Sequence, residues 1–321
     1  MFKKQLALDP EGFLKKKTAE NNQFIAIVKF RNSPTTTYAR IALDATSPIL
    51  NTQPNHEERV TAGQDVIDFL EPAGSGLGCQ IRIRNLSNDE FALFTVKARH
   101  SGKGFRVGVD GLQRVNLAGN AVIEFDTRVA RRLSGADAIT ESEMIERLNG
   151  DGDRIAILAP HGGKIEEFSD KQAKRVLALV GGDVASCWRC MGWSTGGASR
   201  RWHITSTEIS ERSLPLLGNL FEREYQFAVA FHGWTNSYIG VGGGAPLHVR
   251  RSIANRIRQA LAGTGVTVNL ETGSGYSGNN PKNIVNRLTS NGVQIEQSLD
   301  ARRQYWDRIA DAVGHALLEL L

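Results

Sequence analysis

A histidine and a glutamate share one glycine-rich turn in the second half of the chain. The segment APHGGKIE, residues 159–166, follows an apolar run and presents His161 and, five positions later, Glu166. Glycine lets the backbone turn tightly, so both side chains can reach one ion. Imidazole nitrogen and carboxylate oxygen are both zinc donors. The segment suggests two ligands of a metal site, and the alternative is a plain turn with an exposed glutamate.

A second apolar run ends in another histidine. Residues 227–231 lead into His232 and Gly233. Both turns are expected at the carboxyl ends of strands, where open α/β sheets bind their ligands. A catalytic zinc ion commonly takes three protein ligands, and two histidines with one carboxylate are a known set. A lone histidine is more often a packed, hydrogen-bonded side chain. His232 together with His161 and Glu166 nevertheless predicts a zinc site.

A third strand end supplies a further carboxylate. Glu296 closes the otherwise apolar stretch of residues 292–296. Desolvation there is expected to raise its pKa unless the side chain is paired. Beside a zinc ion and its water, such a group could take up a proton during attack and later deliver it to the leaving amine. The alternative is an ion pair with Arg302 or Arg303, and spacing does not decide between the two.

Two polar clusters could contact a substrate. Residues 201–207, RWHITST, place Arg201 and His203 beside three hydroxyl side chains. Farther along, Asn283, Asn286 and Arg287 have helical spacing that makes them neighbours. Arginine suits the binding of a carboxylate or an oxyanion. The alternative for both clusters is helix capping and surface charge, which the residues alone favour.

These side chains must be positioned by alternating strands and helices. Buried strands are expected at 155–159 and 227–231, where apolar residues are continuous, and further strands at 266–270 and 293–296. Helical patterns cover 170–180, 248–261, 281–289 and 300–320. This order predicts an α/β architecture with a mixed sheet flanked by helices. We place this domain at residues 149–321.

The first part of the chain, residues 1–148, has the short, closely spaced strand patterns of a small β-rich domain. Strands are expected at 24–30, 81–84, 91–96 and 105–109, with turn signals between the later ones. Such spacing favours a sandwich or barrel. Residues 141–148 have a helical pattern, and NGDGD at 149–153 predicts a linker or tight turn. The role of this part does not follow from its residues.

Composition excludes several classes of function. The 321 residues carry a formal net charge of +5, but no basic run alternates with aromatic residues, so we infer no nucleic-acid partner. No stretch approaches the roughly 18 apolar residues of a membrane span, and the first residues lack the apolar core of a signal peptide. We therefore expect a cytoplasmic protein without a membrane anchor. The mild basic excess is compatible with an acidic substrate.

Three cysteines give no disulfide framework. Cys187 and Cys190 form a C-x-x-C pair, and Cys79 stands apart. The pair could be redox-active or half of a zinc knuckle, but no second C-x-x-C completes a structural zinc site. Reduced, partly buried thiols are the favoured interpretation.

Six motifs in order, spread over about residues 155–298, resemble the poly-γ-glutamate hydrolase family, which is associated with phages and also occurs in bacterial proteins. They are APHGGKIE, SRRWHITSTE, FHGW, VGGG, NPKNIVNR and GVQIEQS. The resemblance implies a fold like that of the zinc carboxypeptidases. It also implies Zn²⁺ on His161, Glu166 and His232, and Glu296 as general base. The pocket positions of the family fall on Arg201, His203, Asn286 and Arg287.

The resemblance implies a zinc-dependent amide hydrolase acting on an acidic polymer or peptide-like substrate. Poly-γ-glutamate is the substrate that the family suggests. One alternative is a zinc carboxypeptidase or N-acyl amino acid deacylase that acts on small molecules. Another is a zinc-containing, phage-associated binding protein without catalysis. The front part departs from minimal family members, which consist of little more than the hydrolase domain, and this leaves the natural substrate open.

Overall fold

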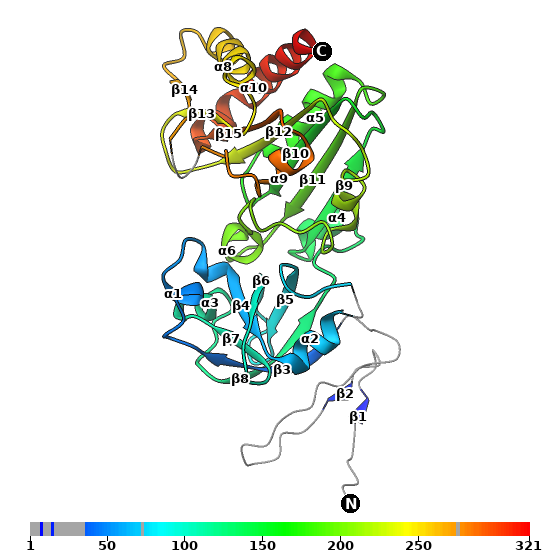
Figure 1. Ribbon diagram of the computed structural model, residues 1–321, viewed down its shortest axis with the longest axis vertical. Helices are drawn as coiled ribbons and strands as arrows, with labels where there is room; N and C mark the ends of the chain where they lie inside the picture. The colour runs from blue at the N-terminus through cyan, green and yellow to red at the C-terminus, as the bar shows by residue number, and fades with distance from the viewer. Residues whose placement is uncertain (1–6, 9–13, 16–35, 72–73, 274–276) are drawn as a thin grey trace, which may run out of the picture.

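The computed structural model describes residues 7–8, 14–15, 36–71, 74–273 and 277–321. Figure 1 shows a barrel formed by the first part of the chain and, next to it, a larger body of sheet and helices, with helix α6 (Ala198–Trp202) where the two meet. Near the N-terminus, β1 (Ala7–Leu8) pairs antiparallel with β2 (Leu14–Lys15). The strand expected at residues 24–30 lies outside the described residues.

Six strands close the barrel, in the order β3-β7-β4-β6-β5-β8. They are β3 (Thr36–Leu43), β4 (Arg59–Ala62), β5 (Gln80–Asn85), β6 (Phe91–Arg99), β7 (Phe105–Val107) and β8 (Ala121–Asp126). Short helical segments connect them: α1 (Pro48–Asn51), the 3₁₀ turn η1 (His56–Glu58), α2 (Gln64–Leu70) and α3 (Val109–Arg114).

The barrel core follows from alternation along its strands. In β5, Ile81 and Ile83 point inward and pack with Phe94 of β6 in one apolar cluster. Arg82 lies between the two isoleucines in sequence and therefore points outward. There its guanidinium stacks 4.5 Å from the ring centroid of Phe91. The strands expected at 81–84, 91–96 and 105–109 are confirmed, except that Val109 already begins α3.

A seven-stranded mixed sheet forms the second body, in the order β14-β13-β15-β12-β10-β11-β9. Its strands are β9 (Met144–Asn149), β10 (Ile155–Gly163), β11 (Ala185–Gly192), β12 (Phe227–Gly233), β13 (Ile239–Gly242), β14 (Val268–Leu270) and β15 (Gly292–Gln297). Its helices are α4 (Gly135–Thr140), α5 (Ser169–Val180), α6 (Ala198–Trp202), α7 (Pro215–Gly218), α8 (Leu247–Ala260), α9 (Ile284–Leu288) and α10 (Leu299–Leu320).

Four parallel strands occupy the centre of this sheet. β15, β12, β10 and β11 run in one direction, whereas β13 and β9 are antiparallel to their inner neighbours. After β10 the chain passes through α5 to β11 on one side, but β12 lies on the other side of β10. The order of strands therefore reverses between β10 and β12, and such a reversal opens a crevice at the carboxyl ends of the strands.

Both faces of the sheet are covered. One core contains Ile155, Ile157 and Ala159 of β10 and the apolar sides of α5, α8 and α10. Ala156 and Leu158 belong to the opposite core, which also contains Phe91 and Leu93 of the barrel strand β6. Continuous apolar strands are thus explained by burial on both sides. None of the helices in the described part of the chain has the length and apolarity needed to cross a membrane.

The predicted mixed α/β sheet flanked by helices is confirmed, although β11 and β13 were not predicted and one predicted helix is wrong. Residues 141–148 were expected to be helical, but β9 occupies 144–149 and pairs antiparallel with β11. Met144, Ile145 and Leu148 have helical spacing, yet pairing with a neighbouring strand outweighs this weak local preference. Because β9 belongs to the second sheet, the predicted division between residues 148 and 149 falls inside this edge strand.

The C-x-x-C pair lies inside a strand rather than in a loop. Cys187 and Cys190 are buried in β11 and belong to the cores on opposite faces of the sheet. Residues three apart in a strand point in opposite directions, so this pair cannot grip one ion. Burial raises the pKa of the Cys187 thiol to about 12. Both thiols are therefore free and buried, and their reduced state stays a prediction.

Candidate active site and metal centre

The turn after β10 returns Glu166 to the side of His161. The Glu166 N–H donates to the His161 carbonyl oxygen at 2.7 Å, which closes the loop. Within it, Gly163 has φ of 70°, and a Cβ there would lie 2.7 Å from the Gly192 carbonyl oxygen of β11. Only glycine meets both demands without strain. The glycine-rich sequence therefore positions the first two predicted ligands.

His232 joins them from the neighbouring strand β12. Its Nδ1 lies 3.2 Å from Nδ1 of His161 and 3.4 Å from Oε2 of Glu166. The His161 Nδ1 lies 3.1 Å from Oε1 of Glu166. All three side chains are buried. Two turns separated by about seventy residues of chain therefore converge at the crevice between β10 and β12.

These three separations fit a zinc ion. Ligands about 2.0–2.1 Å from a tetrahedral zinc lie about 3.3 Å from one another. Other hydrogen bonds hold the two imidazoles in place, because Nε2 of His161 lies 2.9 Å from the Ile204 carbonyl oxygen and Nε2 of His232 lies 3.3 Å from Oγ of Ser206. Such outer partners fix the tautomer and direct the other nitrogen to a metal. Nδ1 of each ring therefore faces the centre.

A buried carboxylate oxygen in the cluster lacks a donor. Oε2 of Glu166 accepts no hydrogen bond from the residues that the structure describes. An unsatisfied buried carboxylate oxygen is costly, and a cation satisfies it. The donor set of two imidazoles and one carboxylate, together with this oxygen, fits a divalent zinc ion.

Electrostatics couple the members of the cluster. Burial raises the pKa of Glu166, but the imidazole of His161 outweighs it and holds the pKa well below its usual range. Burial lowers the pKa of His161, and the Glu166 carboxylate outweighs this and raises it. Burial keeps the pKa of His232 below its ordinary value. A neutral His232 beside an ionised Glu166 suits metal binding, for which His161 must also release its Nδ1 proton.

Glu296 stands directly beside His232 in the sheet. The two residues are Cα partners in the parallel ladder of β12 and β15, so their side chains share one face. Burial raises the pKa of Glu296 well above its usual value, and the charge of Glu166 adds to this. A metal cation in the cluster would act in the opposite direction and favour the carboxylate.

A line of hydrogen bonds orients Glu296. The Gln294 side chain donates from Nε2 to Oε1 of Glu296 at 2.5 Å, and it accepts at Oε1 from Nδ2 of Asn283 at 2.6 Å. Asn283 is itself the N-cap of α9. The line fixes one oxygen of Glu296 and leaves Oε2 for other partners.

Arg302 and Arg303, the predicted alternative partners of Glu296, contact Glu167 instead. Arg302 donates from Nη1 to the Glu167 carbonyl oxygen at 2.7 Å, and Nη2 of Arg303 lies 3.5 Å from Oε2 of Glu167. Arg302 is buried and its charge still acts on Glu296 by lowering its pKa. Gly233 is needed for this arrangement, because a Cβ there would lie 2.2 Å from Nη2 of Arg302.

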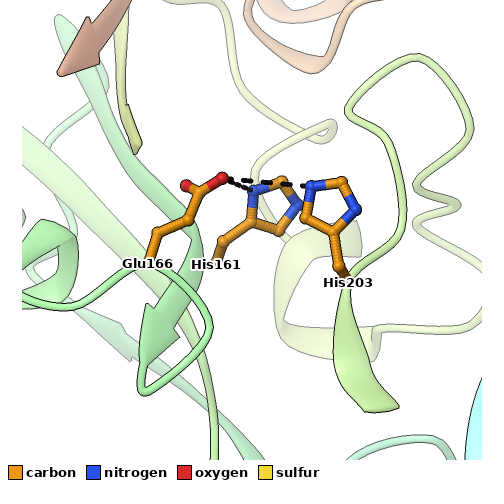
Figure 2. A group of neighbouring side chains, drawn as sticks. All are labelled: His161, Glu166 and His203. Carbon is orange, nitrogen blue, oxygen red and sulfur yellow. Dashed lines mark ion pairs between the residues drawn. The ribbon is translucent and has the colours of Figure 1, made fainter. Parts of the chain in front are cut away.

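His203 lies next to the cluster. Figure 2 shows its ring beside that of His161, with Glu166 facing both. The two ring centroids are 4.1 Å apart, and Nε2 of His203 lies 3.9 Å from Oε1 of Glu166. His161, Glu166 and His203 each offer a ligand atom within 4.8 Å of the others. The set with His232 is tighter and matches the spacing of zinc ligands more closely.

The remaining predicted contacts are engaged in packing. The guanidinium of Arg201 lies 4.3 Å from the ring centroid of Phe91 in the barrel. Asn286 accepts from the Gly244 N–H at 2.8 Å and donates to the carbonyl oxygen of Gly278 at 2.7 Å, so it joins two loops. Arg287 pairs with Glu211. These contacts are outside the cluster, and a role of the three residues in substrate binding stays a prediction.

Sequence reasoning missed several residues that shape the site. Ser206 and Gln294 lie inside motifs that were noted, so their polar side chains next to a ligand and a base were a usable signal. Glu58 of the barrel also reaches the site, since its Oε1 lies 2.5 Å from Nδ1 of His203. In the sequence Glu58 is one of several charged residues in a polar stretch, and nothing there connects it to His203.

Known proteins with similar sequences cover the second body. The family model described as poly-gamma-glutamate hydrolase matches residues 135–314, more than half of the chain. Two Bacillus subtilis (strain 168) proteins are 31% identical: the SPbeta prophage-derived UPF0714 protein YoqZ over 159 residues, and the UPF0714 protein YmaC over 160 residues. The matches cover 48% and 49% of this chain, and only 52% and 62% of those relatives.

A solved structure is similar over the same region. The structure of a bacteriophage poly-gamma-glutamate hydrolase is 24% identical, with a TM-score of 0.45, and the alignment covers 58% of this chain and 95% of that one.

Proposed function

The chain belongs to the poly-gamma-glutamate hydrolase family, and from this premise we propose that it is a zinc-dependent hydrolase of amide bonds. The proposed substrate is poly-γ-glutamate or a similar acidic amide, with the γ-glutamyl linkage as the bond that is cleaved. His161, Glu166 and His232 hold the metal, and Glu296 is the general base. Family membership supports the reaction class.

One observation carries the assignment of the metal site. The Nδ1 atoms of His161 and His232 and the Glu166 carboxylate lie 3.1, 3.2 and 3.4 Å from one another. Residues packed for stability alone would not be expected to aim three donors at a single point and leave the buried Oε2 of Glu166 without a hydrogen-bond donor. The proposal is that this point is the zinc position.

In this mechanism the chain supplies the proton transfer and the orientation. A bound zinc ion lowers the pKa of water to about 7 and polarises a carbonyl. Glu296 takes the proton of the attacking water at Oε2, since Gln294 already donates to Oε1. It then delivers that proton to the leaving amine. Its position beside His232 in the sheet keeps it on the face of the cluster.

Cationic side chains are proposed to recognise the acidic substrate. Arg201 and Arg287, together with His203 and Asn286, are the groups that we assign to carboxylate or oxyanion binding. Arg201 is half-buried, and its present partner is an aromatic ring rather than an acid. A guanidinium stacked on an aromatic ring still has N–H groups in its own plane, and these can donate hydrogen bonds to a substrate carboxylate.

The test combines metal analysis with sizing of the products. Purified protein is expected to contain one zinc ion per chain and to shorten poly-γ-glutamate. Glu296→Gln should retain the zinc but lose turnover. Glu146→Gln is the matched control, because Glu146 and Glu296 are both 8% exposed and burial raises the pKa of each. Full activity of Glu296→Gln on the polymer would show that the base is misassigned.

The product sizes also separate the proposed polymer hydrolase from a carboxypeptidase or deacylase. Release of single C-terminal residues, with no internal cleavage of the polymer, would favour the small-molecule enzymes. A zinc-loaded protein that leaves every amide substrate intact would favour a binding protein. A chain that binds no zinc, with all three ligand residues present, would contradict the proposal altogether.

A further inference from the structure

One carboxylate of the barrel, that of Glu58, contacts residues of the second body. Glu58 ends the 3₁₀ turn η1, just before β4, and only 2% of it is exposed. Burying a carboxylate costs several kcal/mol unless hydrogen bonds and charges compensate. A carboxylate retained in such a place needs partners, and the partners of Glu58 come from the loop after α6.

Each oxygen of Glu58 has its own donor. Oε1 lies 2.5 Å from Nδ1 of His203, and Oε2 accepts from the Thr205 N–H at 2.7 Å. Burial raises the pKa of Glu58, but the hydrogen bond and charge of His203, the charge of Arg114 and the Thr205 N–H together outweigh it and lower the pKa. Glu58 is therefore an ionised acceptor, and the Nδ1 of His203 carries the proton between them.

A second barrel residue holds the same loop. Arg114, which ends α3, donates from Nη2 to the His203 carbonyl oxygen at 3.0 Å and to that of Arg201 at 3.4 Å. Its Nη1 lies 3.9 Å from Oε1 of Glu58. The backbone and the ring of His203 are thus both held from the barrel.

The free edge of the His203 ring faces the metal cluster. With Nδ1–H donated to Glu58, the lone pair is on Nε2, which lies 3.9 Å from Oε1 of Glu166. The ring also lies against that of His161, with an interplanar angle of 36°. An imidazole with an acidic partner on its far nitrogen is the arrangement by which proteins fix a ring for binding or catalysis.

Other residues also join the two bodies. Arg59 and Lys97 of the barrel lie 2.6 and 2.8 Å from Oε1 of Glu208. Arg82 pairs with Glu143 at 2.8 Å, and Gln80 donates to the Glu208 carbonyl oxygen at 2.7 Å. These contacts also tie the barrel to the second body, so Glu58 is not the sole link between the two.

We propose that Glu58 is a positioning residue of the active site, through which the N-terminal barrel orients His203 toward the metal cluster. The barrel is then part of the catalytic unit rather than an attached module. The consequence for activity rests on the function proposed above, whereas the orientation of the His203 ring does not. His203 is the residue that meets the substrate, and Glu58 acts only through it.

The test compares two substitutions in the full chain. Glu58→Gln keeps the shape, but its amide replaces one acceptor oxygen by an NH2 donor, so the contacts with His203 Nδ1 and the Thr205 N–H cannot both be kept. Glu208→Gln is the matched control, because it removes an interface carboxylate that touches Arg59 and Lys97 but not His203. Both variants are first checked by thermal unfolding. We expect Glu58→Gln to lower kcat about 10–100-fold and Glu208→Gln to change it less than about 3-fold.

A second measurement is independent of hydrolysis. The ¹⁵N spectrum of histidine-labelled protein, with the signal assigned by loss in His203→Gln, should show the Nδ1–H form in the wild type and a mixture of ring forms in Glu58→Gln. An unchanged ring spectrum in Glu58→Gln overturns the proposal, as does an equal loss of activity in both variants. Should the wild type cleave no γ-glutamyl bond, the spectrum still decides the role of Glu58.

Discussion

Replacing Gly163 by alanine tests whether the turn between two metal ligands tolerates a side chain. Gly163 has φ of 70°, and its added Cβ would lie 2.7 Å from the carbonyl oxygen and 3.1 Å from the nitrogen of Gly192. A left-handed conformation costs a non-glycine residue about 1–2 kcal/mol. Overpacking against backbone adds about 1–3 kcal/mol. The free energy of unfolding should therefore fall by about 2–5 kcal/mol in Gly163→Ala.

A matched control separates the two costs. Gly265 has φ of 79°, but nothing lies within 4 Å of its added Cβ. Gly265→Ala should thus lose only the conformational part, about 1–2 kcal/mol. All five tryptophans of the chain lie at residue 188 or later. Their fluorescence during denaturant unfolding therefore reports on the second body in both variants.

The functional readout is the affinity of each variant for zinc. Movement of the turn in Gly163→Ala displaces Glu166 from His161, and we expect the Kd for zinc, measured by competition with a chelator, to rise about 10-fold or more. Gly265→Ala should bind zinc as the wild type does. If Gly163→Ala matched Gly265→Ala in both stability and zinc affinity, the argument that the close approach to β11 shapes the metal site would be refuted.

Three further predictions concern metal, pH and thiols. Chelation should lower the Tm and added zinc should restore it, because a ligand at about 1,000 times its Kd adds about 4 kcal/mol to the stability of the folded state; an unchanged Tm would argue against a bound metal. Burial raises the pKa of Asp126, but the Arg128 N–H and the charge of Arg131 outweigh it, so the pKa in the folded protein lies below its ordinary value of 3.8. The ionised Asp126 stabilises the folded protein above that value, and this contribution is lost as the pH falls through the folded pKa. The free energy of unfolding of Asp126→Asn should therefore fall less steeply than that of the wild type as the pH is lowered. Cys187 and Cys190 should resist thiol reagents until denaturant is added, because burial raises the pKa of both; rapid labelling of the native protein would contradict their placement.

Much of the fold could be predicted because its strands are marked by local patterns. Continuous apolar runs identified β10 and β12, and amphipathic spacing identified α5 and α10. β11 was missed, since Arg189 and two cysteines interrupt its pattern. The sequence predicts a helix where β9 lies, because this strand is stabilised by pairing with β11, which is distant in sequence.

The sequence by itself determined which residues were available for chemistry. Glycines after His161 and His232 require tight turns, and apolar runs before both require strands, so each side chain had to stand at a strand end. The short spacing in the sequence also keeps Glu166 near His161, and the Glu166 N–H donates to the His161 carbonyl oxygen.

Only the tertiary structure decided which distant residues meet. The strand order places β12 beside β10, which sets the 3.2 Å between the two histidine nitrogens. Docking of the barrel places Glu58 against His203, two residues 145 positions apart. Hydrogen bonds and ion contacts act over a few ångströms, whereas the polypeptide between these residues constrains their separation only loosely. Burial of apolar surface across the sheet and the barrel supplies the missing constraint.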